Sequence, residues 1–259
     1  MRDDGLDRAI DAAGGVARLA RKIGVSQPSV SSWSKVPAQR VIAVEAATGV
    51  SRNQLRPDLY SESPMSEGQI DPVDAARAQE YLLLASLLSA APSKRLLDQL
   101  AALIGDGTPL GRAHAALAEA AAGAVAAKVE REYFDLFVGL GRGELLPYAS
   151  YYLTGFLNER PLSRLRSDLA ALGIERVAGN FEPEDHAAIL CEIMAGFAGG
   201  RFAASSDAQR TFFEKQVAPW MGRLFADIES AESATFYRAV GALGRAFIEI
   251  ETKAFTFAN

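Results

Sequence analysis

The chain has 259 residues, of which 49% are hydrophobic, and a formal net charge of −5. This length and composition allow one large or two modest domains with real cores. The single cysteine, Cys191, excludes an intramolecular disulfide, and two histidines supply a protein-only zinc site poorly. No stretch approaches the ~18 apolar residues of a membrane helix, and the charged N-terminus lacks an apolar signal core. We therefore expect a cytoplasmic protein that is neither exported nor inserted into a membrane.

Charge is divided unevenly along the chain. Residues 1–60 carry nine Lys and Arg against six Asp and Glu, a net charge of +3, whereas the remainder carries 18 against 26, a net charge of −8. The stretch 61–70 is polar, contains Ser, Pro and Gly, and shows no periodicity, which is typical of a linker. We expect an N-terminal domain over 1–60 and a C-terminal domain over 71–259.

The N-terminal domain carries a helix-turn-helix pattern between residues 16 and 33. A small Ala20 lets two helices cross closely, and Gly24 can take the left-handed conformation of a tight turn. Val30 and Trp33 would bury the inner face of the second helix, which Ser26 can cap. The spacing predicts a small helical bundle that binds DNA.

The outward face of the second helix supplies the expected DNA contacts. Gln27, Ser31 and Ser32 are candidates for base edges. The candidates for phosphates are Arg18, Arg21, Lys22, Lys35 and Arg40. One such module is small, so we expect two copies on a two-fold site and hence a homodimer at least on DNA. A bundle used for protein contact is the alternative, because +3 is a weak basic footprint.

The flanks of this pattern add a resemblance. Residues 6–15, 36–49 and 55–60, together with the helix-turn-helix, resemble Cro-like proteins of the YdaS type over about residues 4–60. The connection after Trp33 is short here, only Ser34-Lys35, where such proteins often have a longer Gly- and basic-rich segment. The resemblance implies a DNA-binding module.

The C-terminal domain shows helical periodicity throughout and no strand alternation, so we expect an all-α protein. The expected helices are 74–90, 93–104, 110–138 with an interruption near Gly123, 149–157, 161–172, 183–199, 207–230 and 234–255. Pro219 predicts a kink in the penultimate helix. The apolar stripes of these helices are expected to form the core.

Acidic residues gather where one of these helices is expected to begin. Pro183 suits the first helical position, and Glu182, Glu184 and Asp185 place negative charge at the helix start. His186 would lie in the first turn, at the end of an apolar stripe. A well-capped helix with an ordinary histidine is the plain alternative.

Several motifs together resemble the TorD/DmsD family over roughly residues 71–257. They are Tyr133-x-x-Leu136-Phe137-x-Gly139, Pro147-Tyr148-x-Ser150-x-Tyr152, Glu182-Pro183-x-Asp185-His186, Glu192-x-Met194 and Phe212-Phe213 before Pro219-Trp220. Gln216 stands where the family often has His. The resemblance implies an all-helical cytoplasmic chaperone for molybdoenzymes exported by the twin-arginine route, and implicates Asp185 and His186 in signal-peptide recognition.

A twin-arginine signal joins two arginines to an apolar segment of roughly 7–15 residues, so its receptor needs carboxylates beside an apolar groove. Asp185 is the first choice for guanidinium contact, with Glu182 and Glu184 beside it. The apolar part is expected from Phe137, Tyr148, Tyr151 and Tyr152, with His186 at its rim. The charge of −8 would attract the basic end of the signal from a distance.

Catalytic interpretations are poorly supported. Cys191 follows His186 by five residues, about 140° around a helix, and Asp185 adjoins His186, so neither pair shares a face. The glycine run 139–143 lacks the Gly-Lys-Ser/Thr signature of a phosphate loop and is expected to be a flexible connection. We expect neither enzyme activity nor a resident cofactor, with weak nucleotide binding a minor option implied by the resemblance.

Two functions outside catalysis stay open. One is a chaperone for a molybdoenzyme precursor, such as a formate dehydrogenase or an S- or N-oxide reductase, with an attached DNA-binding module. The other is a one-component transcription regulator whose helical domain senses a small ligand or peptide.

Overall fold

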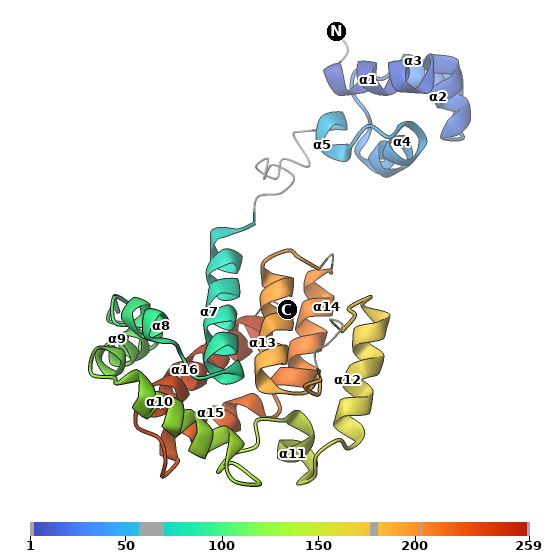
Figure 1. Cartoon of the computed structure of the whole chain (residues 1–259). Helices are drawn as coiled ribbons and strands as arrows, with labels where there is room; N and C mark the ends of the chain where they lie inside the picture. Colours follow the sequence, from blue (N-terminus) through green and yellow to red (C-terminus); the bar gives the residue numbers. More distant parts are fainter. Residues whose placement is uncertain (1–2, 57–69, 177–180, 203, 258–259) are drawn as a thin grey trace. The chain divides into compact units, whose positions relative to one another are not determined.

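The computed structural model describes residues 3–56, 70–176, 181–202 and 204–257. The chain divides into two compact units, Met1–Gln69 and Ile70–Asn259 (Figure 1). Across the described ranges both units are built from helices, and extended pairing is confined to an isolated bridge between Tyr148 and His186. The all-α prediction is therefore confirmed. Of the expected linker, 61–70, only Ile70 belongs to the described residues.

The smaller unit is a bundle of short helices around one apolar cluster. Its elements are α1 (Asp4–Ala13), α2 (Val16–Lys22), α3 (Gln27–Ser31), a 3₁₀ turn (Ala38–Arg40), α4 (Val41–Thr48) and α5 (Arg52–Leu55). Leu6, Leu19, Val30, Val44 and Leu55 are fully buried in the cluster. Because α1 contacts α2, α4 and α5, it holds the bundle together.

The helix-turn-helix geometry follows the sequence pattern. Gly24 has a φ of +70°, which the turn between α2 and α3 requires and which glycine adopts without strain. Ser26 Oγ accepts a hydrogen bond from Ser29 N and caps α3. Ala20 and Val30 are buried, and Trp33 packs against the same cluster. The predicted roles of these residues in the turn are confirmed.

The larger unit consists of longer helices. Its elements are α7 (Pro72–Ser89), α8 (Lys94–Leu100), α9 (Pro109–Ala122), α10 (Ala126–Tyr133), α11 (Ala149–Thr154), α12 (Arg160–Ala171), α13 (Ala187–Ala198), α14 (Ser206–Phe212), α15 (Met221–Ser230) and α16 (Phe236–Phe257), with π-helical segments at Phe134–Val138 and Phe213–Val217. Helix α13 packs along α7, and α16 packs against α15 and α9. Figure 1 shows α12 at the edge of this unit, outside α13 and α14.

Helix α13 is the centre of the larger core. Helix α13 carries buried residues on nearly all of its faces, as expected of a helix that other elements cover on every side. Leu190, Cys191 and Met194 are fully buried there, in one cluster with Trp220 and Tyr237. Burial also raises the pKa of the Cys191 thiol well above its ordinary value, so this cysteine is an inert core residue.

Two interruptions of the helices lie where the sequence places them. Helix α9 ends at Ala122, beside Gly123, and Pro219 lies between the second π-helical segment and α15. At the latter break Ala218 N donates to Phe213 O, five residues back, which is the wider π-helical pattern. The 110–138 helix ends in the other π-helical segment, a change of winding that apolar periodicity does not reveal.

The predicted start of the 183–199 helix is wrong. The helix begins at Ala187, and His186 is its N-cap with extended backbone (φ −65°, ψ 138°). The segment before it pairs with the start of α11, because Ala149 N donates to Asp185 O and Ala187 N donates to Pro147 O. These long-range hydrogen bonds hold 185–186 out of the helix, despite a local sequence that suits a helix start.

The glycine run is a tight turn packed on the first π-helical segment. Gly139 has a φ of +62°, and a Cβ there would meet Arg142 O, while a Cβ at Gly143 would meet the backbone of Phe137. Glu144 N and Leu145 N donate to Asp135 O and Leu136 O. Gly139 N donates to Phe134 O in addition, so backbone hydrogen bonds at both ends tie the turn to the π-helical segment.

Candidate functional site

The short bridge between Tyr148 and His186 brings together the motif segments 147–152 and 182–186 of the larger unit. It joins the N-cap residues of α11 and α13, and beside it Ser150 bonds to Asp185, 35 positions further along the chain. The Tyr148 ring meets the His186 ring edge-on, with centroids 5.0 Å apart. The bridge is therefore the point around which the candidate site is built.

Asp185 lies beneath this bridge, with 1% of its surface exposed. Its Oδ2 accepts a hydrogen bond of 2.8 Å from Ser150 N, which satisfies a donor at the start of α11. Asp185 Oδ1 and Ser150 Oγ are both buried without a partner among the described residues. Asp185 therefore fixes the start of α11 through Ser150 N, and its contact with a guanidinium stays a prediction.

His186 caps α13 with its side chain. Its Nδ1 accepts a hydrogen bond of 3.1 Å from Ala188 N, so the neutral ring carries its proton on Nε2. Burial lowers the pKa of His186, and Glu182 and Asp185 oppose this only in part. The ring is therefore neutral near pH 7, and it is 8% exposed, which is deeper than the rim position that the sequence suggested.

Glu182 is the exposed carboxylate of the group. Tyr148 donates its hydroxyl hydrogen to Glu182 Oε1, and burial together with this carboxylate raises the pKa of Tyr148. Burial and the charge of Glu182 also raise the pKa of Tyr133, whose ring lies on α10. Glu182 therefore lies at the surface, close to the aromatic side chains of Tyr148 and Tyr133.

Glu184 is engaged by arginines of the same chain. Arg166 Nε and Nη2 both lie 2.9 Å from Glu184 Oε2, and Arg176 Nη1 lies 3.8 Å from Oε1. Burial would raise the pKa of Glu184, but these partners hold it below its ordinary value. Sequence reasoning did not find this ion-pair group, because Arg166 lies on another helix.

The other predicted aromatic residues lie elsewhere. Tyr152 donates a hydrogen bond of 2.8 Å to Asp227 Oδ2, and its ring packs against that of Trp220. The guanidinium of Arg142 lies over the ring of Tyr151. Phe137 packs against Tyr133 and Tyr237 in the core. Of the four predicted aromatic residues, Tyr148 belongs to the residues around the bridge, Tyr148, Glu182, Asp185 and His186, which we call the bridge group.

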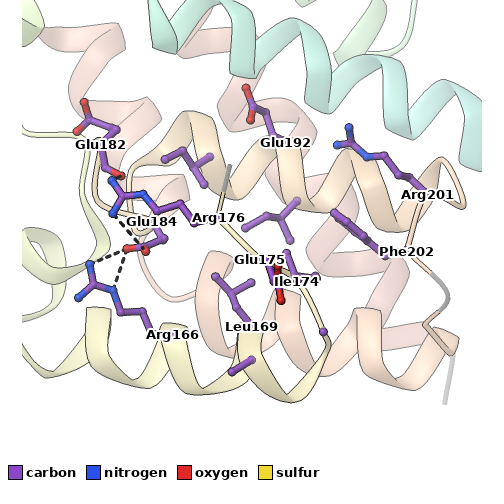
Figure 2. A pocket seen from close by; sticks show the side chains of 14 residues that line it. Arg166, Leu169, Ile174, Glu175, Arg176, Glu182, Glu184, Glu192, Arg201 and Phe202 are labelled. Carbon is purple, nitrogen blue, oxygen red and sulfur yellow. Dashed lines mark hydrogen bonds and ion pairs between the residues drawn. The ribbon is translucent and has the colours of Figure 1, made fainter. Parts of the chain in front are cut away.

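A cleft of about 530 Å³ opens next to this group, between α12 and α13 (Figure 2). Its apolar lining is Leu169, Ile174, Ile189, Ile193 and Phe202, and its charged lining is Arg166, Glu175, Arg176, Glu182, Glu184, Glu192 and Arg201. The sequence prediction included Glu182 and Glu184 but missed the cleft. A further sequence signal for it is Glu192, which belongs to the motif Glu192-x-Met194 and follows Ile189 by one helical turn.

Gln216 shows what the departure from the family pattern does. Its side-chain Nε2 donates to Asp168 Oδ2 at 2.6 Å, and its backbone oxygen accepts from Trp220 Nε1 at 2.8 Å. The residue therefore fastens α12 to the second π-helical segment. The amide donates this bond without itself taking up or losing a proton, unlike a histidine at this position.

In the smaller unit the predicted DNA contacts lie at the surface. The exposed residues are Arg18, Arg21, Lys22, Gln27, Ser31, Ser32, Lys35 and Arg40. Lys22 Nζ donates to Ala47 O and Ser32 Oγ donates to Ser29 O. Helix α3 and its C-cap thus expose the polar side chains Gln27, Ser31 and Ser32, and α2 exposes the cations Arg18, Arg21 and Lys22.

Comparison with known proteins decides the family of the larger unit. The chaperone protein TorD of Aliivibrio fischeri is 30% identical over 200 residues, which cover 68% of this chain and 93% of TorD. The chain belongs to the TorD chaperone family. A family model described as nitrate reductase delta subunit also matches residues 105–226. TorD of Vibrio cholerae O1 El Tor is 29% identical over 46% of this chain and 58% of its own length.

The smaller unit of this TorD-family protein is similar to a different group. A family model described as bacterial toxin YdaS matches residues 6–64. YdaS of Escherichia coli K12, which is named as a transcriptional regulator, is 43% identical over 58 residues, or 20% of this chain and 59% of YdaS. Both resemblances expected from the sequence motifs are confirmed.

Within the described ranges, none of the helices combines the length and apolar character needed to cross a bilayer. Nor do three or more His, Cys, Asp or Glu side chains gather into a metal-binding group in the part of the chain that the structure describes.

Proposed function

We propose that this TorD-family protein binds the apo-form of a molybdoenzyme, together with its twin-arginine signal peptide, while the cofactor is inserted. The observation that carries the proposal is the similarity to a protein named as a chaperone along 93% of that protein's length. The candidate clients are a formate dehydrogenase and an S- or N-oxide reductase. The protein acts by binding, without turnover.

The bridge group supports this proposal physically. Glu182 offers an exposed carboxylate, Tyr148 presents a ring beside it, and His186 adds a neutral ring with its proton on Nε2. A carboxylate next to aromatic faces suits a guanidinium, which can donate hydrogen bonds and stack. Asp185 contributes by positioning, since it fixes the start of α11 from below.

The first experiment is affinity purification of the full chain from its native host, followed by mass spectrometry and by titration of a labelled twin-arginine peptide. A chaperone should bring down an apo-enzyme subunit and bind the peptide. Recovery of no molybdoenzyme subunit, together with no saturable binding of the peptide, would contradict the proposal and favour a sensor of a small ligand.

We also propose that the smaller unit binds DNA as a dimer, on the similarity of residues 6–64 to YdaS. Gln27, Ser31 and Ser32 lie on the exposed face of α3 for base contact, and Lys35 lies just beyond. Phosphate contacts would come from the exposed cations Arg18, Arg21, Lys22 and Arg40. Such contacts weaken steeply with salt, because each releases condensed counterions.

Footprinting on the promoter of the protein's own gene tests this second proposal. Protection should appear at low salt over two half-sites about one helical turn apart. The double variant Gln27→Ala, Lys35→Ala should lose it, whereas Glu119→Gln in the larger unit should not. Protection that persists in the double variant would place the DNA contacts elsewhere.

A further inference from the structure

The turn that joins α11 to α12 exposes large apolar side chains. Every residue from 153 to 160 is exposed, and Leu153, Phe156 and Leu157 lie among them, with Phe156 showing 69% of its surface. Figure 1 shows this turn at the rim of the larger unit, where α11 leads into α12. We call these three side chains and the backbone that carries them the apolar turn. Large apolar side chains exposed together mark a site of contact with a protein or a membrane.

Hydrogen bonds hold the apolar turn in one conformation. Gly155, with a φ of +83°, ends α11, and its N–H donates to Tyr151 O. Thr154 Oγ1 donates to Ser150 O at 2.8 Å and accepts from Phe156 N at 3.2 Å. An ordered backbone therefore presents Phe156 to solvent, so the surface that covers it does not have to order the turn first.

Arginines surround the apolar turn, although the chain as a whole is acidic. Arg160 and Arg164 are exposed on the first two turns of α12, and neither takes part in an ion pair within the described ranges. Arg142 is exposed above α11, with its guanidinium carbon 5.7 Å from the centroid of the Tyr151 ring. Glu159 is the exposed carboxylate of the turn, so these side chains give a local net charge of +2.

The α15 side of the same surface is electrically balanced. Arg223 lies over the Tyr152 ring, with its guanidinium carbon 5.6 Å from the centroid, and Asp227 accepts the hydroxyl hydrogen of Tyr152. Both charged side chains are exposed and their charges are opposite. The positive charge beside the apolar turn is therefore that of the other three arginines.

The shape of the apolar turn favours a lipid surface over a protein as its partner. The turn protrudes, because all of residues 153–160 are exposed, and a protein partner would need a hollow that matches it. Lipid headgroups move aside for a protruding side chain, which then reaches the boundary of the acyl chains. Arginines beside it can bury their aliphatic stems and keep their charges among the phosphates, where anionic lipid attracts them.

We propose that the apolar turn binds reversibly to the surface of an anionic phospholipid bilayer. Leu153, Phe156 and Leu157 enter the headgroup layer, while Arg160 and Arg164 meet lipid phosphates. The protein lies on the bilayer and does not cross it, and a contact of this size is weak enough to reverse. Membrane binding by this turn is separate from recognition of a client, and either can hold without the other.

Co-sedimentation of the full-length protein with sucrose-loaded vesicles tests the proposal. The vesicles contain phosphatidylcholine with about 30% phosphatidylglycerol, or phosphatidylcholine alone. Wild-type protein should sediment with the anionic vesicles, and its partition coefficient should be about tenfold lower on the neutral ones. Raising the salt concentration should reduce the difference, because salt screens the arginines from the lipid charge.

One double variant removes the apolar part of the contact and leaves every charge in place. Phe156→Ser with Leu157→Ser should lower the partition coefficient on anionic vesicles about tenfold. The control is Ile104→Ser with Val125→Ser, which removes two exposed aliphatic side chains that lie after α8 and before α10. This control should bind the vesicles as wild type does.

A second double variant removes the charged part. Arg160→Gln with Arg164→Gln should lower the partition coefficient about tenfold on anionic vesicles and leave it unchanged on neutral ones. The control is Arg95→Gln with Lys128→Gln, which removes two exposed positive charges from α8 and α10 and should have little effect. Binding through the basic smaller unit would instead respond equally to both pairs. Thermal melts of all four variants check that each is folded.

Three outcomes would overturn the proposal. The first is wild-type protein that sediments with neither kind of vesicle. The second is an equal loss in the two charge variants, which would assign vesicle binding to the overall charge or to the smaller unit. The third is vesicle binding that survives Phe156→Ser with Leu157→Ser while the same variant loses self-association in analytical ultracentrifugation, which would assign the apolar turn to a second copy of this chain.

Discussion

Two polar clusters in the larger unit are buried to the same depth but differ in how completely their hydrogen bonds are satisfied. Between α7 and α16, Glu251 is 1% exposed and accepts from Arg77 Nε, Arg77 Nη2 and Tyr81 Oη at 2.7–2.9 Å. Before α13, Asp185 is equally buried, but Oδ1 has no partner among the described residues. The fully paired Glu251 serves stability alone, whereas the incompletely paired Asp185 holds α11 and also lies beside the exposed groups of the candidate binding site.

The α7–α16 cluster should give the largest stability effect. Glu251→Ala leaves the Arg77 guanidinium and the Tyr81 hydroxyl without their shared acceptor in a buried place. Removing one partner of a buried pair typically costs about 3–5 kcal/mol. We expect the free energy of unfolding, measured by urea titration, to fall by about that amount. Peptide affinity below the melting temperature should not change, and a loss of affinity in a folded Glu251→Ala protein would break the comparison.

Asp185→Ala should have the next largest effect, again on stability. The substitution leaves Ser150 N buried without an acceptor at the start of α11, which costs about 1–3 kcal/mol. This differs from the effect expected of a surface ligand, whose loss would change binding alone. Asp185→Asn is the control, because an amide oxygen can still accept from Ser150 N. Equal destabilisation by both variants would show that the charge of Asp185, rather than its hydrogen bond, holds α11.

The sequence predicted the helices better than the site, for a physical reason. Apolar spacing and helix breakers such as Gly123 and Pro219 act within about one helical turn. Their effects can therefore be predicted from the order of neighbouring residues in the sequence. The site depends on pairings across the chain. Glu184 is taken by Arg166, 18 residues away, and His186 is kept out of the helix by its pairing with the segment at Tyr148. Neither partner is indicated by the local pattern.

Glu182→Gln should change binding with little change in stability. The amide keeps an acceptor for the Tyr148 hydroxyl, so the local geometry survives while the exposed charge is lost. We expect an affinity loss of about 1 kcal/mol for a peptide with two arginines, measured by calorimetric titration. Glu119→Gln removes the same charge from α9 and should leave affinity unchanged. A melting temperature lowered by several degrees in Glu182→Gln would instead class this residue with Glu251.

The two histidines give the smallest effects and extend the comparison to pH. The hydrogen bond that His114 Nε2 donates to Glu80 Oε2 raises the pKa of His114, so the contribution of His114 to stability is present below about pH 6.5 and lost as pH rises through its folded pKa. Burial lowers the pKa of His186, so its contribution is present above about pH 6.5 and lost as pH falls toward its folded pKa. The two groups therefore oppose each other as the solution is acidified.

Single variants separate the opposite effects of His114 and His186 on the pH dependence of stability. Acidification from about pH 7.5 to about pH 5.5 protonates His114 beside its partner and forces a proton toward a buried ring at His186. His186→Asn keeps a side chain that can cap α13 but does not titrate, so it should lose less stability than wild type over this interval. His114→Gln should lose more, because the stabilising charge pair with Glu80 no longer forms at low pH. Each difference should be roughly 0.5–1 kcal/mol, read from urea midpoints at the two pH values. If both variants instead differed from wild type in the same direction, the His186 ring would become charged in the folded protein. The start of α13 would then hold the imidazolium of His186 beside Glu182 and Asp185.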